Sequence, residues 1–480
     1  MVSLFDLVAP VVPPPAEYLS QVAQVKRFLE AFIGDDQFRE KFLDDSPGVL
    51  EDRGITDVSR ADLQVCLKAD TRLLTIQALL NGQAPDPKVP DALAKYCAFV
   101  AEKFRWRDAV FRDSEPADMN LKVWRERQIN RCLIQFGAAN AAGLVHSPLA
   151  IELSKGCTVG CWFCGLGAEK YQGYFPYTDD NAVLWRECLE VLRHVIGPAA
   201  GQGVLYWATE PFDNPDYELF MADYHAAMGR WPQTTTAMAT KDLGRTRNLL
   251  RLARMHNGMI DRFSILSVGQ LRQVHSSFTP EELLLVECIT QNKEAGMLKV
   301  RSGRAAQATE ARSKLVVDRN APGASSIACI SGFLLNMVDK RVQMITPCDA
   351  DNNWPLGYWV LDEMSFSDAC SLEKALRMMI DQRCQPELKP DRHLTVYPEI
   401  VVDSLKPENA LVLRAELTTT EVKCGGIDSD VMADIFASRT CTLESVARQI
   451  EVQPELLSAV AVARKMYRRG LFDEDPKRGV

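Results

Sequence analysis

The sequence lacks both an excess of basic residues and any long apolar run. Its 64 Asp and Glu residues outnumber its 55 Lys and Arg residues, which gives a formal net charge of −9. Proteins that bind nucleic acid neutralise phosphates with clustered Lys and Arg, so we expect no nucleic-acid partner. No stretch approaches the roughly 18 apolar residues of a membrane-spanning helix, and residues 1–16 lack the parts of a secretory signal. We therefore expect a cytoplasmic protein with no membrane partner.

Cysteine is plentiful by contrast, but few of the 14 cysteines are close together in the sequence. Thiols stay reduced in the cytoplasm, so we expect no disulfide framework. The one tight group is Cys157, Cys161 and Cys164, in the segment Glu-Leu-Ser-Lys-Gly-Cys-Thr-Val-Gly-Cys-Trp-Phe-Cys-Gly that begins at Glu152. Three thiolates in one short loop can each ligate one iron of a 4Fe–4S cluster and leave the fourth iron open to an external ligand.

A zinc site completed by a ligand elsewhere is the alternative use of these thiols. Structural zinc sites normally combine paired CxxC spacings to supply four protein ligands. Here CxxC occurs once, at Cys161 and Cys164, and Cys157 precedes it by four residues. The spacing therefore favours the iron–sulfur cluster over zinc.

The hydrophobic pattern divides the chain into four regions. Residues 1–145 are predicted to be helical, and residues 146–320 alternate short apolar runs with helical patterns. This alternation indicates an α/β fold with a partial barrel. Residues 321–403 are predicted to form further strands and a helix, and residues 404–480 a small winged-helix-like module. Within the barrel region, strands are expected at 149–153, 204–207, 234–238, 263–266 and 298–300, and helices at 184–195, 217–228, 245–255 and 280–293.

The cysteine segment, with Phe163 between Cys161 and Cys164, resembles the CxxxCxφC loop of the radical S-adenosylmethionine (SAM) superfamily. The resemblance implies a partial (β/α)6 barrel with the loop after its first strand, one 4Fe–4S cluster and SAM as cofactors, and an electron donor such as flavodoxin or ferredoxin. Further close cysteine pairs and an upstream cobalamin-binding domain are lacking, so we expect a single cluster. The cofactors carry the radical chemistry, and the protein aims the radical.

The resemblance also implies SAM-binding residues. In Tyr-Trp-Ala-Thr-Glu-Pro, Glu210 and Pro211 match the end of the family's Gly-Gly-Glu-Pro motif, whereas the two glycines are absent. A carboxylate at the end of a strand can pair with the amino group of SAM. Phe163 belongs to the same predicted site, and Thr240, Ser264 and Ser267 are candidate ribose contacts.

Over most of its length the chain resembles the radical SAM amino-acid epimerases of the proteusin or polytheonamide type, which mature ribosomally made peptides. Residues 28–55, within a leader-like segment of about 18–75, resemble leader segments of precursor peptides. The resemblance implies a leader-bearing precursor peptide as the partner, recognised by this segment or by the winged-helix-like module. An ordinary three-helix packing unit is the alternative for the N-terminal segment. Another peptide-tailoring reaction, such as thioether cross-linking, and a non-catalytic leader-binding component are the alternative functions.

Epimerisation requires a hydrogen atom to return to the opposite face of the α-carbon, and a thiol is a natural donor. Cys370 lies where the epimerase family places its donor, and Cys348 is the rival. A hydrogen-atom donor must keep its proton, and ionised Asp368 and Glu373 would favour the protonated thiol. Cys370 is therefore the predicted donor, against the alternative that it only begins a helix.

Overall fold

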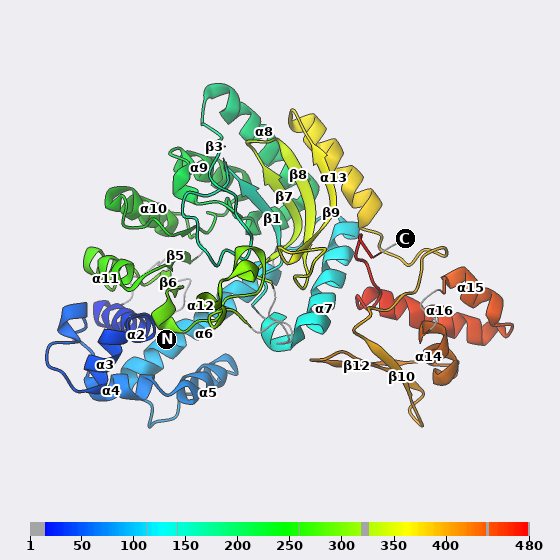
Figure 1. Cartoon of the computed structure of the whole chain (residues 1–480), viewed down its shortest axis with the longest axis horizontal. Helices are drawn as coiled ribbons and strands as arrows, with labels where there is room; N and C mark the ends of the chain where they lie inside the picture. The colour runs from blue at the N-terminus through cyan, green and yellow to red at the C-terminus, as the bar shows by residue number, and fades with distance from the viewer. Residues whose placement is uncertain are drawn as a thin grey trace.

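The computed structural model describes residues 15–112, 114–141, 143–258, 260–317, 326–437 and 441–478. The first 14 residues of the predicted helical region lie outside these ranges. In the described ranges no helix combines the length and the apolar character that crossing a bilayer requires. Helices alternate with several small sheets, so the expectation of a mixed α/β protein is confirmed (Figure 1).

The N-terminal region is built from helices that pack around phenylalanines. Phe28 and Phe42 lie with ring centroids 4.8 Å apart, and Phe38 meets Phe28 at 6.1 Å. Their spacing along the chain places these rings on the inner faces of successive helices. The helices are α2 (Ala16–Gly34), α3 (Asp36–Leu43), α4 (Arg60–Cys66), α5 (Ala69–Leu80), α6 (Asp91–Arg112) and α7 (Met119–Ala141), with a short 3-10 turn η1 (Glu51–Arg53).

The largest sheet has the order β1 (Ser147–Glu152), β7 (Ile330–Asn336), β8 (Arg341–Pro347) and β9 (Tyr358–Ser365). Strands β1 and β7 are parallel, and the remaining pairs are antiparallel. Alternate side chains of β1 face opposite ways: Leu149 packs in the main core with α8 (Asp179–Ile196) and α13 (Ala369–Arg383), and Ala150 faces Leu334 and Trp207. One face of the sheet is thus covered by α8 and α13, and the other is free to form a site (Figure 1).

A second, parallel sheet consists of β4 (Thr235–Thr236), β5 (Asp261–Ile265) and β6 (Val286–Thr290). Helices α9 (Tyr217–Met228), α10 (Leu243–Met255) and α11 (Val268–Ser277) alternate with these strands along the chain. The predicted strands 204–207 and 298–300 contribute only single bridges, Ala150 to Val204 and Lys299 to Val316. The described strands close no barrel, and the partial barrel stays a prediction.

The predicted helix at 280–293 is wrong. Its second half is strand β6, in which Val286, Cys288 and Thr290 point into the protein with the period of two expected of a strand. The run Glu-Glu-Leu-Leu-Leu has good helix propensity, but parallel pairing with β5 overrides a preference worth only tenths of a kcal/mol per residue. The remaining short 3-10 turns in this part are η2 (Gly197–Gln202), η3 (Pro211–Asp213) and η4 (Lys293–Ala295).

The C-terminal module lies beside α7 at the far end of the molecule from α2 to α5 (Figure 1). Arg127 of α7 pairs with Glu474 at 3.1 Å and lies over the ring of Tyr467. The module has three helices and a three-stranded antiparallel sheet. Its elements are β10 (Val401–Leu405), β11 (Ala410–Arg414), β12 (Thr419–Lys423), α14 (Ser429–Ala437), α15 (Leu443–Gln449) and α16 (Gln453–Arg468).

Candidate active site

The cysteine loop follows β1 directly and folds back on itself. A two-residue strand β2 (Ser154–Lys155) pairs with β3 (Gly173–Tyr174) and closes the base of the loop. Above it the Cys157 N–H donates to the Glu169 carbonyl at 2.9 Å. Gly156 has a φ of 73°, and a Cβ there would lie 2.3 Å from the Lys170 carbonyl oxygen, so only glycine fits this approach. The three cysteines are unpaired and partly exposed.

The three thiols are close enough to influence one another. Burial, together with the charges of Cys164 and Cys157, raises the pKa of Cys161 to about 11. Burial also raises the pKa of Cys157, with opposing hydrogen bonds from the Val159 and Gly160 N–H groups. A cationic centre among these sulfurs would reverse the repulsion and hold all three as thiolates.

The three thiols of the loop are not gathered as tightly as the ligands of one metal ion. Thiolates around one tetrahedral zinc at a Zn–S distance of about 2.3 Å stand only about 3.8 Å apart. In the part of the chain that the structure describes, Glu30, His275 and Cys288 are the one set of three such ligands found within 4.8 Å of one another. The loop thiols form no such set as they stand, and the choice between a cluster and zinc stays a prediction from their spacing in the sequence.

Glu30, His275 and Cys288 are themselves poorly suited to a metal. Lys26 lies 2.6 Å from Glu30 Oε1, which places a cation beside the would-be ligand. Arg53 Nη1 faces His275 Nδ1 at 3.4 Å, so the imidazole accepts there and carries its proton on Nε2, the nitrogen directed at Glu30. This group instead joins α2 to α11 and β6.

Glu210 is buried next to the loop, and its charge acts on Cys157. Its Oε1 accepts from the Thr236 hydroxyl and from the Phe212 N–H at 3.3 Å, and its Oε2 accepts from the Ala237 N–H at 2.9 Å. Burial raises the pKa of Glu210 despite these bonds. The carboxylate therefore ties the segment after residue 207 to β4.

The other predicted SAM contacts are less closely gathered. Phe163 packs edge-on against Trp162 within the loop. The Thr240 hydroxyl donates to Gln273 on α11, and Ser267 caps that helix by accepting from the Gln270 N–H at 3.1 Å. Ser264 lies half-buried on β5, on the face opposite the core residue Phe263. Sequence reasoning did not see that the Ser267 hydroxyl is occupied as a helix cap.

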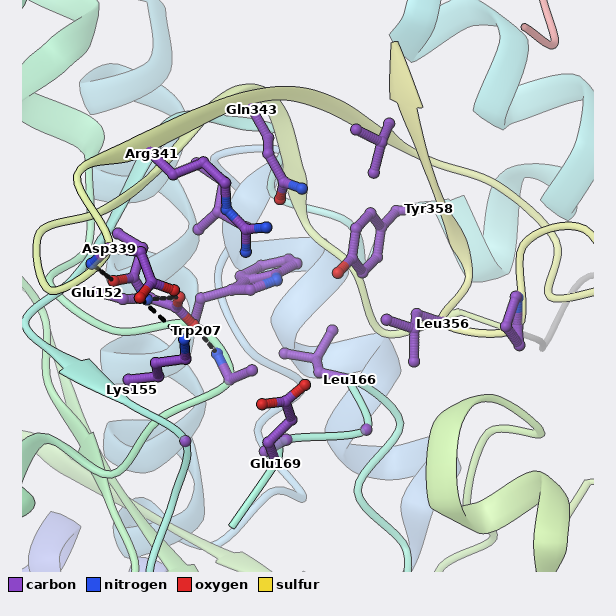
Figure 2. A pocket seen from close by; sticks show the side chains of 18 of the residues that line it. Glu152, Lys155, Leu166, Glu169, Trp207, Asp339, Arg341, Gln343, Leu356 and Tyr358 are labelled. Atoms are coloured by element: carbon purple, nitrogen blue, oxygen red, sulfur yellow. Dashed lines mark hydrogen bonds and ion pairs between the residues drawn. The ribbon is translucent and has the colours of Figure 1, made fainter. Parts of the chain in front are cut away.

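A cavity of about 500 Å³ opens beside the loop, on the sheet face not covered by α8 and α13 (Figure 2). Glu152 at the end of β1 accepts from the Ala208 N–H and from Asn336 Nδ2, both at 2.9 Å, and burial raises its pKa. The Tyr358 hydroxyl points into the cavity, and burial together with Glu152 raises its pKa to about 12. The other labelled lining residues are Lys155, Leu166, Glu169, Trp207, Asp339, Arg341, Gln343 and Leu356.

Neither predicted donor cysteine lines this cavity. Cys370 is exposed in the first turn of α13, the helix that covers the opposite face of the sheet. Cys348 is buried just beyond β8, where burial raises its pKa well above the usual value. Sequence reasoning missed Tyr358, because a tyrosine near the beginning of a strand carries no pattern that marks it as a cavity residue.

The structure defines a mixed α/β protein with a three-cysteine loop beside a polar cavity. The curated protein named uncharacterized protein y4wI, from Sinorhizobium fredii (strain NBRC 101917 / NGR234), is 38% identical over 380 residues, which cover 77% of this chain and 72% of that protein. The chain belongs to the same family as y4wI. No protein-family model and no solved structure matches this chain.

Proposed function

We propose that this chain is a radical SAM enzyme that converts L- to D-residues in a ribosomally made precursor peptide. The observation that carries the proposal is the loop of Cys157, Cys161 and Cys164 directly after β1, next to the buried carboxylate of Glu210. When bound there, a reduced 4Fe–4S cluster and SAM would supply a 5′-deoxyadenosyl radical. The protein's part is to hold the ligands, orient the peptide and exclude competing reactions.

The order of elements supports a partial (β/α)6 barrel around this site. Parallel pairing runs from β4 through β5 to β6, with a helix between successive strands. Val204 bridges to Ala150 of β1, and Lys299, in the segment after β6, bridges to Val316, both in parallel orientation. Loops after the carboxyl ends of parallel strands are where barrel enzymes place their active sites, and both the cysteine loop and Glu210 follow such ends.

The cavity supplies what a peptide substrate needs. Its volume lies in the range of ligand pockets, and its walls combine apolar rings with amide groups. Trp207 and Tyr358 meet edge-on with centroids 6.0 Å apart, and Gln343, which donates to Glu363, adds an amide group to the same wall. Glu152 and Arg341 add opposite charges to the same walls. A stretch of a few residues fits here beside Leu166 of the loop.

Reaction in deuterium oxide tests the proposal. We expect the anaerobic, iron-reconstituted protein with SAM and a reductant to form 5′-deoxyadenosine. With a leader-bearing precursor peptide it should place about one solvent deuterium at each converted α-carbon, because the donor hydrogen exchanges with solvent. Mass spectrometry and chiral analysis after hydrolysis provide the measurement. A dehydrated or cross-linked product would assign another tailoring reaction, and a protein that binds no iron would contradict the radical SAM assignment.

The identity of the hydrogen donor stays a prediction from the resemblance, and the Cys370→Ala variant tests it. If Cys370 returns the hydrogen atom, the variant still cleaves SAM but forms no D-residues. Its exposed position on α13 predicts no loss of folding from the substitution. If this variant still forms D-residues, Cys370 is not the hydrogen donor. The Tyr358→Phe variant would then test whether the Tyr358 hydroxyl in the cavity returns the hydrogen atom.

A further inference from the structure

The segment from Lys299 to Arg312 lies against the cysteine loop. It contains the short helices η5 (Gly303–Gln307) and α12 (Glu310–Ser313). The Arg304 N–H donates to the Cys164 carbonyl at 3.0 Å. Two chain segments some 140 residues apart are therefore joined at a cysteine that the proposed function makes a cluster ligand.

The Arg304 side chain makes two further bonds to the loop. Its Nε donates to the Cys161 carbonyl at 2.8 Å, and its Nη1 donates to the Ala168 carbonyl. One guanidinium thus bridges the beginning and the end of the second half of the loop. Charge-assisted bonds of this kind are about twice as strong as neutral ones, and the rigid fork of arginine fixes their geometry.

The backbone around Arg304 is fitted closely to the same half of the loop. A Cβ on Gly303 would lie 2.5 Å from the Cys164 carbonyl oxygen and 2.6 Å from that of Gly165, and its φ is 52°. Ser302 is fully buried, and its hydroxyl is among the buried polar atoms without a hydrogen-bond partner in the described chain. The fit leaves no room for another side chain between segment and loop.

Two more cations of the segment hold the loop's aromatic residues. The Lys299 ammonium lies 5.0 Å from the ring centroid of Phe163, and the Arg312 guanidinium 5.1 Å from that of Trp162. The first half of the loop is anchored separately, because Asp213 accepts from the Thr158 N–H at 2.9 Å and from its hydroxyl at 2.6 Å. Only the half with Cys161 and Cys164 depends on the cationic segment.

We propose that Arg304 is a positioning residue that holds Cys161 and Cys164 in place for the iron–sulfur cluster before the cluster is assembled. The role rests on the proposed function, since it assigns these thiols to iron. The Arg304 side chain bonds to the loop through carbonyl groups and not through the sulfur atoms. Its positive charge also favours the more negative, reduced form of a thiolate-ligated cluster, which raises the reduction potential.

The test compares Arg304→Gln and Arg304→Lys with wild type, and uses Arg377→Gln as a matched control. Arg377 is a half-exposed arginine on α13 that pairs with Glu373 on the same helix at 2.7 Å. In the apo protein, alkylation of Cys161 and Cys164 by iodoacetamide is mapped by mass spectrometry, and the rate constant per thiolate is taken from the pH–rate profile, because loss of the Arg304 charge raises the pKa of Cys161. This rate constant should be about tenfold higher in Arg304→Gln, with that of Cys157 little changed. Arg304→Lys, which keeps the charge but loses the fork, should fall between.

Iron content and the cluster's midpoint potential complete the test. After reconstitution Arg304→Gln should hold less than about half the wild-type iron and have a lower potential, whereas Arg304→Lys should retain the wild-type potential. If the wild type binds iron but the glutamine variant has unchanged alkylation rates and an unchanged potential, the proposed role of Arg304 is overturned while the proposed function stands. A wild type that takes up no iron would overturn the proposed function together with this role.

Discussion

The Cys161→Ser variant is expected to lose its bound iron and to cleave SAM at least about a hundredfold more slowly than wild type. Substitution of residues that merely support metal ligands already costs 10–100-fold, so loss of a ligand should cost more. Cys161 belongs to the closely spaced pair with Cys164, and a cluster held by two thiolates leaves two irons open instead of one. Iron analysis, the visible absorption of the reconstituted protein and the yield of 5′-deoxyadenosine measure the effect.

The control for this variant is Cys441→Ser in the C-terminal module. Its thiol lies 3.1 Å from the Ser445 hydroxyl, so a serine there keeps a polar partner. The Cys161 side chain is partly exposed, and its replacement should leave the fold and the thermal transition near those of wild type. Full iron content in Cys161→Ser would refute the cluster, and stoichiometric zinc in the wild type would replace it with the zinc alternative.

Local signals in the sequence predicted the helices and the cysteine loop well. Helix α9 has the bounds 217–228 that the apolar periodicity predicted, and the tight cysteine spacing marked a segment that the structure places as a loop directly after β1. The helix at 280–293 failed because strand pairing, which is invisible to a local window, decided its second half. Periodicity thus works where a segment's own faces determine its packing.

The surroundings of the loop could not be predicted in the same way. Arg304 reaches the cysteines from about 140 residues away, and its role depends on a close backbone approach that no sequence spacing encodes. The run Lys-Val-Arg-Ser-Gly-Arg from Lys299 is rich in cations and could have marked the segment as a partner of an anionic group. The cavity is assembled from segments that range from residue 152 to residue 477, so its polar walls appear only after folding.

The N-terminal region is joined to the rest of the protein by a buried ion triad. Asp35 is fully buried, pairs with Arg53, and accepts from Arg272 Nε at 2.7 Å and Nη2 at 2.9 Å. It also caps α3 by accepting from the Phe38 N–H. Arg272 lies on α11, so one carboxylate connects the leader-like helices to the parallel-strand region.

Asp35→Ala is therefore expected to lower the free energy of unfolding by about 3–4 kcal/mol. Removing one member of a buried ion pair leaves the others uncompensated, at a cost of about 3–5 kcal/mol, and the exposure of Arg272 reduces that figure. Lost capping adds about 1 kcal/mol. Asp35→Asn keeps the size and part of the cap and should cost about 2 kcal/mol. Denaturant titration measures both, with exposed Asp44→Asn as the control.

The contribution of Asp35 to the free energy of unfolding should depend on pH. Burial alone would raise the pKa of Asp35, but hydrogen bonds from Arg272 and Phe38 and the charge of Arg53 lower it below the usual value. A lowered pKa in the folded protein means that the ionised carboxylate stabilises the fold above its unfolded pKa of about 3.9. That contribution is lost as pH falls through the lower folded value. The difference in the free energy of unfolding between wild type and Asp35→Asn should hence be largest at pH 6 and shrink below about pH 4. A difference that does not change with pH would show that the lost cap, and not the charge, causes the destabilisation.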